Sequence, residues 1–183
     1  MSSRQSVIVI LIVIGCTEAP SLKNTPSRID TVSAVPATKA TICDTTFDKA
    51  GAKVRPFKLP ALRPLALGKL LETHQQWLWV NLWATWCAPC REEMALLKRW
   101  QTAMQGDGID FALQLVSIDA PEDEAKLQSA IHQGLPSETV WLDGENAFSA
   151  IKETLGLGHD AAIPIHALVD PNGNLRCVRV GAV

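Results

Sequence analysis

Residues 77–94 read WLWVNLWATWCAPCREEM. The first seven are aromatic or branched apart from Asn81, which we expect to serve a buried hydrogen bond rather than chemistry. This pattern is typical of a strand buried on both faces. Thr85 then offers a hydroxyl that can cap a helix, and Cys90, Glu93 and later apolar residues recur at steps of three and four, so they share one helix face. The segment predicts a buried strand, a short turn and a helix.

Two cysteines lie at the start of the predicted helix. At Cys87 the unpaired backbone N–H groups and the helix dipole favour a thiolate, so we expect it to be the nucleophile of thiol–disulfide exchange. Cys90, one turn later on the inward face, is expected to resolve the mixed disulfide. Glu93 shares that face, where burial favours the protonated form of a carboxylate, and is the expected general base for Cys90. The open alternative is that Glu93 points to solvent or caps the helix.

Apolar and helix-like segments alternate after this region, which favours an α/β sandwich. The expected elements are, in chain order, a strand at 111–119, a helix opening at Pro121, a strand at 139–142 and a helix at 145–155 ended by Gly156. Two further apolar strands follow Pro164 and are joined by a Pro-Asn-Gly turn at 171–173.

The N-terminus has the features of a secretory signal. Arg4 precedes an apolar run at 7–14, and Gly15 and Cys16 follow it. This ending resembles a bacterial lipobox, in which the signal is removed before the cysteine and the cysteine receives lipid. We therefore expect a signal peptide over 1–15 and lipidation of Cys16; a plain signal peptide or a buried strand is the alternative. No apolar run reaches the ~18 residues that a transmembrane helix needs.

Residues 16–50 open with a stretch rich in Ser, Thr and Pro and poor in large apolar side chains, which predicts a tether, and one domain is expected over 51–183. The chain carries 17 Lys and Arg against 19 Asp and Glu, a formal net charge of −2. This balance lacks the basic excess of a nucleic-acid-binding protein. At 47% hydrophobic residues, the chain is also not wholly disordered.

Five cysteines bear on the compartment. If Cys16 carries lipid, four remain, and an even number in a secreted chain predicts disulfides. The two-residue gap makes Cys87 and Cys90 the expected pair, which leaves Cys43 and Cys177 to form a structural disulfide. The alternative is that Cys43 or Cys177 is a lone buried thiol.

The segment 81–93, followed later by Ile163-Pro164 and a strand ending in Asp-Pro-Asn-Gly, resembles the thioredoxin fold. More narrowly, it resembles the TlpA/ResA-type thiol-disulfide oxidoreductases of bacterial envelopes, whose signature runs close to Asn-Phe-Trp-Ala-Thr-Trp-Cys-x-Pro-Cys-x-x-Glu-Met. The resemblance runs from Arg55 to the C-terminus, with an opening strand at 56–59. It implies a three-layer α/β sandwich in which helices flank a central mixed β-sheet. The C-terminal helix usual in relatives is expected to be missing here.

The resemblance implies four catalytic residues, namely Cys87, Cys90, Glu93 and Pro164. In the family this proline is cis, faces the two thiols and blocks metal capture by them, and the client chain docks beside it as an added strand. The client-binding residues implied are Trp86, Ile163 and Pro164.

The expected function is reduction of protein disulfides by a lipid-anchored enzyme of the bacterial cell envelope that faces the periplasm. Disulfide-containing clients and a membrane dithiol donor of the DsbD kind are its expected partners, and we expect a monomer without cofactor, metal or nucleic acid. One alternative is a Sco-like copper chaperone with Cys87, Cys90 and His166 as ligands, although that group spaces its cysteines differently. His166 could instead be an ordinary strand histidine with a satisfied hydrogen bond. A third hypothesis is a tethered interaction module without redox activity.

Overall fold

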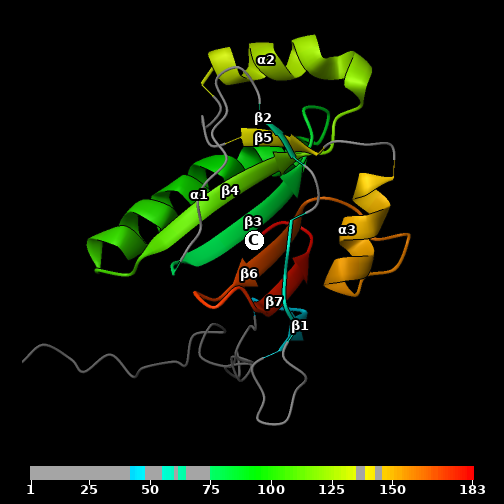
Figure 1. The fold of residues 1–183 in the computed structure, drawn as a ribbon. Helices are drawn as coiled ribbons and strands as arrows, with labels where there is room; N and C mark the ends of the chain where they lie inside the picture. Colours follow the sequence, from blue (N-terminus) through cyan, green and yellow to red (C-terminus); the bar gives the residue numbers. More distant parts are fainter. Residues whose placement is uncertain (1–41, 48–54, 60–61, 65–74, 135–138, 143–145) are drawn as a thin grey trace, which may run out of the picture. The chain divides into compact units, whose positions relative to one another are not determined.

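One seven-stranded sheet runs through the computed structural model, which describes residues 42–47, 55–59, 62–64, 75–134, 139–142 and 146–183 (Figure 1). The elements are, in chain order, β1 (Thr45–Thr46), β2 (Leu62–Pro64), β3 (Trp77–Trp83), α1 (Ala88–Gly106), β4 (Phe111–Ser117), a 3₁₀ turn (Pro121–Asp123), α2 (Glu124–His132), β5 (Thr139–Leu142), α3 (Ala147–Leu155), β6 (Ile165–Val169) and β7 (Leu175–Val180). Within the described residues, no helix is long and apolar enough to cross a membrane.

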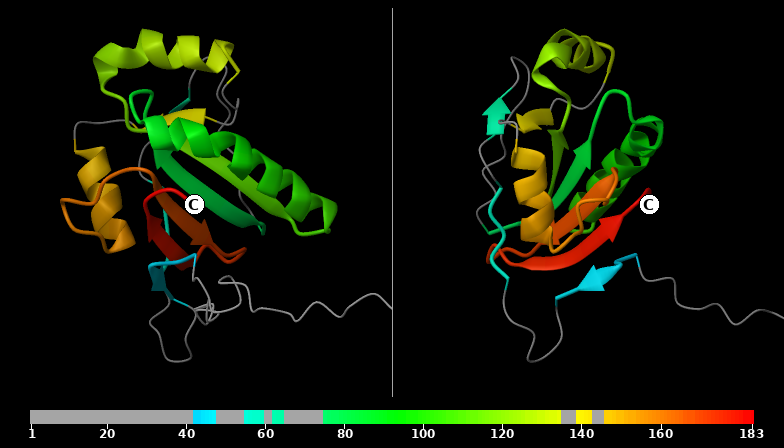
Figure 2. Two further views of the ribbon diagram at one scale, coloured as in Figure 1. Left: turned by 180° about the vertical axis from the view of Figure 1, so that it is seen from behind. Right: turned by 90° about the vertical axis from the view of Figure 1, so that its right-hand side faces the viewer.

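The strand order is β1-β7-β6-β3-β4-β5-β2, which places β3 at the centre. β3 pairs in parallel with β4 and antiparallel with β6. β4 and β5 are parallel, whereas β2, β7 and β1 join antiparallel. Figure 2 shows α1 and α3 on opposite sides of the sheet. The predicted thioredoxin-like sandwich with a mixed sheet is therefore confirmed.

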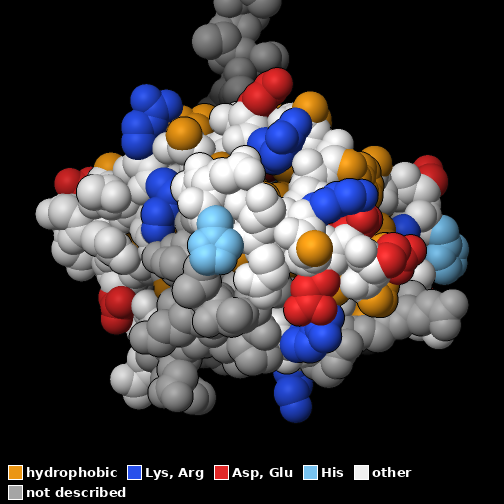
Figure 3. All heavy atoms as spheres, turned by 90° about the horizontal axis from the view of Figure 1, so that it is seen from above, with side chains coloured by type: hydrophobic (Ala, Val, Ile, Leu, Met, Phe, Trp, Pro, Cys, Tyr) orange, Lys and Arg blue, Asp and Glu red, His pale blue; other side chains and the backbone are white. Residues whose placement is uncertain are grey.

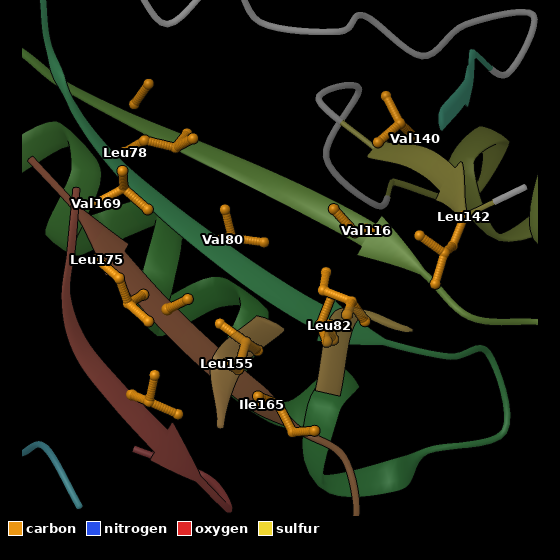
Figure 4. Packing of buried hydrophobic residues seen from close by; sticks show 14 residues of the cluster. Leu78, Val80, Leu82, Val116, Val140, Leu142, Leu155, Ile165, Val169 and Leu175 are labelled. Carbon is orange, nitrogen blue, oxygen red and sulfur yellow. The ribbon is translucent and has the colours of Figure 1, made fainter. Parts of the chain in front are cut away.

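Strand β3 supplies apolar side chains to both layers of the core. Trp79 and Trp83 pack with the inward residues of α1 and α2 in one cluster. The alternate residues Leu78, Val80 and Leu82 pack with β6, β7 and α3 in a second cluster on the other face (Figure 4). The aromatic and branched run in the sequence is thus explained, because side chains alternate between the faces of a strand and both faces of β3 are covered.

Several predicted boundaries differ from the observed ones. The strand expected at 111–119 ends at Ser117, because Asp119 turns its carboxylate back toward the turn after β3. The helix expected to open at Pro121 begins as a 3₁₀ turn before α2. Of the segment expected as an opening strand, only Pro56 makes a β-bridge, to Asn174.

The helix expected at 145–155 is α3, which begins at Ala147; residue 145 lies outside the described residues. Gly156 ends it with a φ of 75°, the left-handed conformation that favours glycine at a helix C-terminus. No helix follows β7 in the residues described up to Val183.

Part of the expected tether forms a strand of the sheet. Residues 45 and 46 form β1 on the free edge of β7, and Asp44 adds a backbone N–H to the carbonyl oxygen of Val178 at 2.9 Å. Cys43 forms a disulfide with Cys177, with their Cα atoms 5.4 Å apart. This end of the expected tether therefore belongs to the domain, and the alternative of lone thiols is wrong. The expected signal at 1–15 and Cys16 lie outside the described residues.

Removal of this disulfide should lower stability substantially. The bond closes a loop across a sequence separation of 134, and long loops gain most from closure in the chain-entropy account. We expect Cys43→Ser/Cys177→Ser to lower the free energy of unfolding by about 2–5 kcal/mol in urea titrations. Wild-type stability in the double variant would contradict this account of β1.

The turn between β6 and β7 is organised by one buried carboxylate. Asp170 Oδ1 accepts backbone N–H groups from Asn172 and Asn174 at 2.9 and 2.8 Å, and Oδ2 lies 2.7 Å from the Arg176 guanidinium. Burial acts to raise the pKa of Asp170, but the hydrogen bonds from Asn174 and Arg176 outweigh it and hold the pKa below its usual range. Folding therefore favours the ionised form of Asp170.

Asp170→Asn should destabilise the protein in a pH-dependent way. A lowered pKa in the folded state contributes stability above the unfolded value of about 4, and this contribution is lost as the pH falls through the folded value. We expect the free energy of unfolding of Asp170→Asn to be about 1–3 kcal/mol below that of the wild type at neutral pH. The difference should shrink below about pH 4, where the carboxyl of the unfolded wild type and then that of the folded protein take up a proton. Urea titrations of both proteins across this range measure it; a deficit independent of pH would contradict the assignment.

Candidate active site

Helix α1 begins at the two cysteines, and Cys87 itself caps it. Its backbone is extended (φ −85°, ψ 98°) and its Sγ accepts the Cys90 backbone N–H at 3.3 Å. Pro89 lies in the first turn, where the missing N–H costs nothing. A sulfur that accepts this N–H gains from the same unpaired donors that stabilise a thiolate. The expected N-terminal position of Cys87 is therefore observed.

The cap predicted at Thr85 is wrong. Its hydroxyl donates to Asp119 at 2.7 Å, and its backbone N–H donates to the same carboxylate at 3.0 Å. Ser117 Oγ also donates to Asp119, at 2.7 Å. The Asp119 carbonyl in turn accepts the Trp141 indole N–H. Because parallel strands β3 and β4 end at the same edge of the sheet, this carboxylate ties both ends together just before Cys87.

Asp119 is a residue that the sequence analysis did not single out. The sequence signal that could have indicated it is an acidic residue two positions after the end of a buried strand. Its carboxylate is buried and its partners are all hydroxyl or amide donors.

Cys87 and Cys90 form a disulfide with Cα atoms 5.3 Å apart. Cys90 is fully buried, whereas Cys87 keeps 5% exposure, and the neighbouring Trp86 is 64% exposed. Any approach from solvent therefore meets Trp86 and Cys87 first. The exposure agrees with the expected division between an attacking and a resolving sulfur.

The Ile163–Pro164 peptide bond is cis. Ile165, the next residue, is opposite Leu82 of β3, so Pro164 lies at the end of β3 from which the chain leads to Cys87. Ile163 is half-buried and packs against the cluster that contains both cysteines. The Pro164 carbonyl accepts the Gly181 N–H at 2.8 Å, which leaves this segment joined to the end of β7.

Glu93 points into the protein. Its side chain is 3% exposed; the alternatives of a solvent-facing or capping role are wrong. Oε1 accepts an N–H from Asn81 Nδ2 at 3.0 Å, and Oε2 accepts the Val183 backbone N–H at 3.2 Å. Asn81 therefore serves a buried hydrogen bond, as predicted, and its partner is the carboxylate one helical turn from Cys90.

His166 joins this polar group from β6. Nδ1 accepts the Trp79 indole N–H at 3.1 Å, and Asn81 Nδ2 lies 3.2 Å from the same atom. Nε2 lies 3.4 Å from Glu93 Oε1. In the part of the chain that the structure describes, no group of three His, Cys, Asp or Glu side chains is placed to hold a metal ion. The observed neighbours of His166 are thus Trp79, Asn81 and Glu93, whereas the copper alternative requires the two cysteines.

The family model named Redoxin matches residues 49–183. The chain belongs to the Redoxin family. This membership and the Cys87–Cys90 disulfide at the start of α1 make it a thiol-disulfide oxidoreductase. The hypothesis of a tethered module without redox activity is therefore wrong. The TlpA/ResA resemblance is likewise supported.

Several solved structures share the fold of this Redoxin protein at low sequence identity. A secreted thiol-disulfide isomerase from Corynebacterium glutamicum is 17% identical with a TM-score of 0.57, covering 80% of this chain and 87% of the other. The thioredoxin domain of a thiol-disulfide oxidoreductase from Bacteroides vulgatus is 20% identical, with a TM-score of 0.53 and coverage of 75% and 90%. A Chlorobium tepidum protein described as thiol:disulfide interchange protein DsbE is 22% identical, with a TM-score of 0.53 and coverage of 70% and 86%. These likenesses support the fold.

Thr85→Val should weaken the anchor before Cys87 in this Redoxin protein. Valine keeps the shape of threonine but leaves the buried Asp119 carboxylate with one donor fewer, so we expect a loss of about 1–3 kcal/mol of unfolding free energy. Thr85→Ser, which retains the hydroxyl, is the matched control and should stay near wild type. Equal stability of both variants in urea titrations would show that the hydroxyl does not hold the carboxylate.

Proposed function

We propose that the protein reduces disulfides of client proteins in the bacterial cell envelope by dithiol exchange at Cys87 and Cys90. The observation that carries the proposal is the disulfide at the N-terminus of α1, in which only Cys87 keeps exposure, beside the exposed Trp86. A nucleophile must reach its client, while the resolving thiol must be protected from competing disulfides.

The reaction begins with the reduced pair. The Cys87 thiolate attacks one sulfur of a client disulfide, forms a mixed disulfide and releases the other client sulfur as a thiolate, which takes a proton from water. The Cys90 thiol then loses its proton and attacks Cys87 Sγ. The Cys87–Cys90 bond forms as the bond to the client breaks, and the client leaves with two electrons.

Glu93 is the proposed base for the second step. It lies one turn from Cys90 on the same inward helix face and is buried, so water has little access to the Cys90 thiol there. A carboxylate can take the Cys90 proton as the sulfur attacks. Charge separation inside the protein is avoided because the proton moves from one buried group to another.

The client is proposed to dock beside Trp86, Ile163 and Pro164. The exposed indole of Trp86 offers an apolar surface, and Pro164 lies at the end of β3 nearest to Cys87. Pro164 has no N–H and its carbonyl is taken by Gly181, so an extended client segment would add as a strand to the backbone of Ile163 just before it, which would bring its disulfide to Cys87 Sγ.

We place the enzyme in an oxidising compartment, anchored through lipid on Cys16 as a monomer and recharged by a membrane dithiol donor of the DsbD kind. The Cys43–Cys177 disulfide supports this compartment, since such bonds persist mainly outside the cytosol.

The face in Figure 3 has acidic and basic side chains interspersed, unlike a phosphate-binding surface.

Cys90→Ser should trap the client. Without a resolving thiol, the Cys87 mixed disulfide persists and accumulates as a covalent adduct with a disulfide-containing substrate protein, detectable by mass spectrometry. Cys87→Ser should form none, and Cys43→Ser/Cys177→Ser, which leaves the site intact, should cycle like wild type. Equal adduct formation by Cys87→Ser and Cys90→Ser would contradict the division of roles.

The reduction potential of the pair then decides the direction. We expect it at or below about −220 mV, measured by mass spectrometry of alkylated thiols across graded dithiothreitol. A value near −120 mV would instead mean an oxidant that makes disulfides in its clients.

A further inference from the structure

His166 and Glu93 face each other inside the protein, from β6 and α1. Nε2 of His166 is 3.4 Å from Oε1 of Glu93, and both side chains are only 3% exposed. Nε2 has no hydrogen-bond partner among the described residues. Burying a ring nitrogen without a hydrogen-bond partner costs free energy, so its position beside a buried carboxylate calls for an explanation.

The other ring nitrogen of His166 shows where the proton lies. Nδ1 accepts the indole N–H of Trp79 at 3.1 Å, and an indole nitrogen can only donate. The Asn81 amide nitrogen, which donates to Glu93, also lies 3.2 Å from Nδ1. Nδ1 therefore carries no proton, and the proton of the neutral ring is on Nε2, on the side of Glu93.

Side chains from the two neighbouring strands, β3 and β7, lie beside the His166 ring. An N–H at Nδ1 would be directed against the N–H of Trp79. Arg179 is the cross-strand partner of His166 on β7 and lines the same small cavity, of about 40 Å³. Its guanidinium lies 3.4 Å from the Asp44 carboxylate. On α1, Cys90 and Glu93 are both buried on the inward face of the helix.

We propose that His166 is a positioning residue for the exchange reaction: its ring, fixed by Trp79, presents Nε2 to Glu93 Oε1 at 3.4 Å and holds that side chain beside Cys90. The proton of Cys90 goes to Glu93, and His166 only fixes where that carboxylate lies. The inference rests on the proposed role of Glu93. A base that is already held beside the thiol does not have to be reoriented before it takes the proton, so His166 speeds the second step of the exchange.

Ellman's reagent separates the two steps. Reduced protein releases one thionitrobenzoate when Cys87 attacks and a second when Cys90 resolves the mixed disulfide, so the two phases report different residues. We expect His166→Phe, which keeps a ring but has no ring nitrogen, to leave the first phase unchanged and to slow the second about threefold. This is less than a full hydrogen bond to a charged group is worth, because Nε2 lies 3.4 Å from Glu93 Oε1 without making a hydrogen bond.

Two variants control for packing. His166→Gln places an amide N–H at a similar reach and should restore most of the second phase. Trp79→Phe removes the indole donor but keeps an aromatic ring, and should slow the second phase by less than His166→Phe. Trp100→Phe is the matched control, because Trp100 packs against Trp79 at a centroid distance of 5.7 Å and should leave both phases unchanged.

Nitrogen-15 NMR of the histidine rings provides a readout that is independent of activity. The chain has four histidines, and the spectrum of His166→Phe identifies the missing signal. We expect the Nε2–H tautomer for His166 in the wild type and a mixture of tautomers in Trp79→Phe. A proton on Nδ1 in the wild type would overturn the inference.

The outcomes are distinguishable. If Glu93→Gln slows the second phase but His166→Phe keeps the wild-type rate, the positioning role is wrong and the role of Glu93 stands. If Glu93→Gln has no effect on the second phase, the proposed base is wrong and the inference falls with it. A slower second phase in His166→Phe without rescue by His166→Gln would also overturn it.

Discussion

The pairing of β3 on both edges and its burial on both faces constrain the rest of the molecule. A strand in this position cannot slip by one residue, because a slip would exchange the side chains of its two faces. Trp79, Asn81 and Trp83 are therefore held toward α1, while the alternate residues contact the layer of α3. The same strand ends at the cap of α1, so its register also places Cys87.

A group of polar residues between β3, α1 and β6 interrupts an otherwise apolar core. Asn81, Glu93 and His166 are each at least 95% buried, and burying such groups is favourable only when they bond to one another. They come from β3, α1 and β6, so their hydrogen bonds form only when the three elements have docked. This group thus couples the position of α1, and with it the disulfide, to the centre of the sheet.

Much of this architecture follows from local patterns. The continuous aromatic and branched run at 77–83 predicted β3, the steps of three and four predicted the inward face of α1, and Glu93 was placed on that face correctly. The prediction at Thr85 failed because a hydroxyl before a helix can cap it or bond elsewhere, and only Asp119, 34 residues later, decides between them. The two short strands β1 and β2 were missed because two or three residues carry no measurable period.

The sequence by itself determined the dithiol, its place at a helix N-terminus and the family signature around it, because each depends on residues within a few positions of one another. Only the tertiary structure decided that Trp79 and Glu93 lie on either side of His166, and that Cys43 reaches Cys177. These contacts join residues 73 to 134 positions apart. Their distances are set by strand order and register, which no local pattern contains.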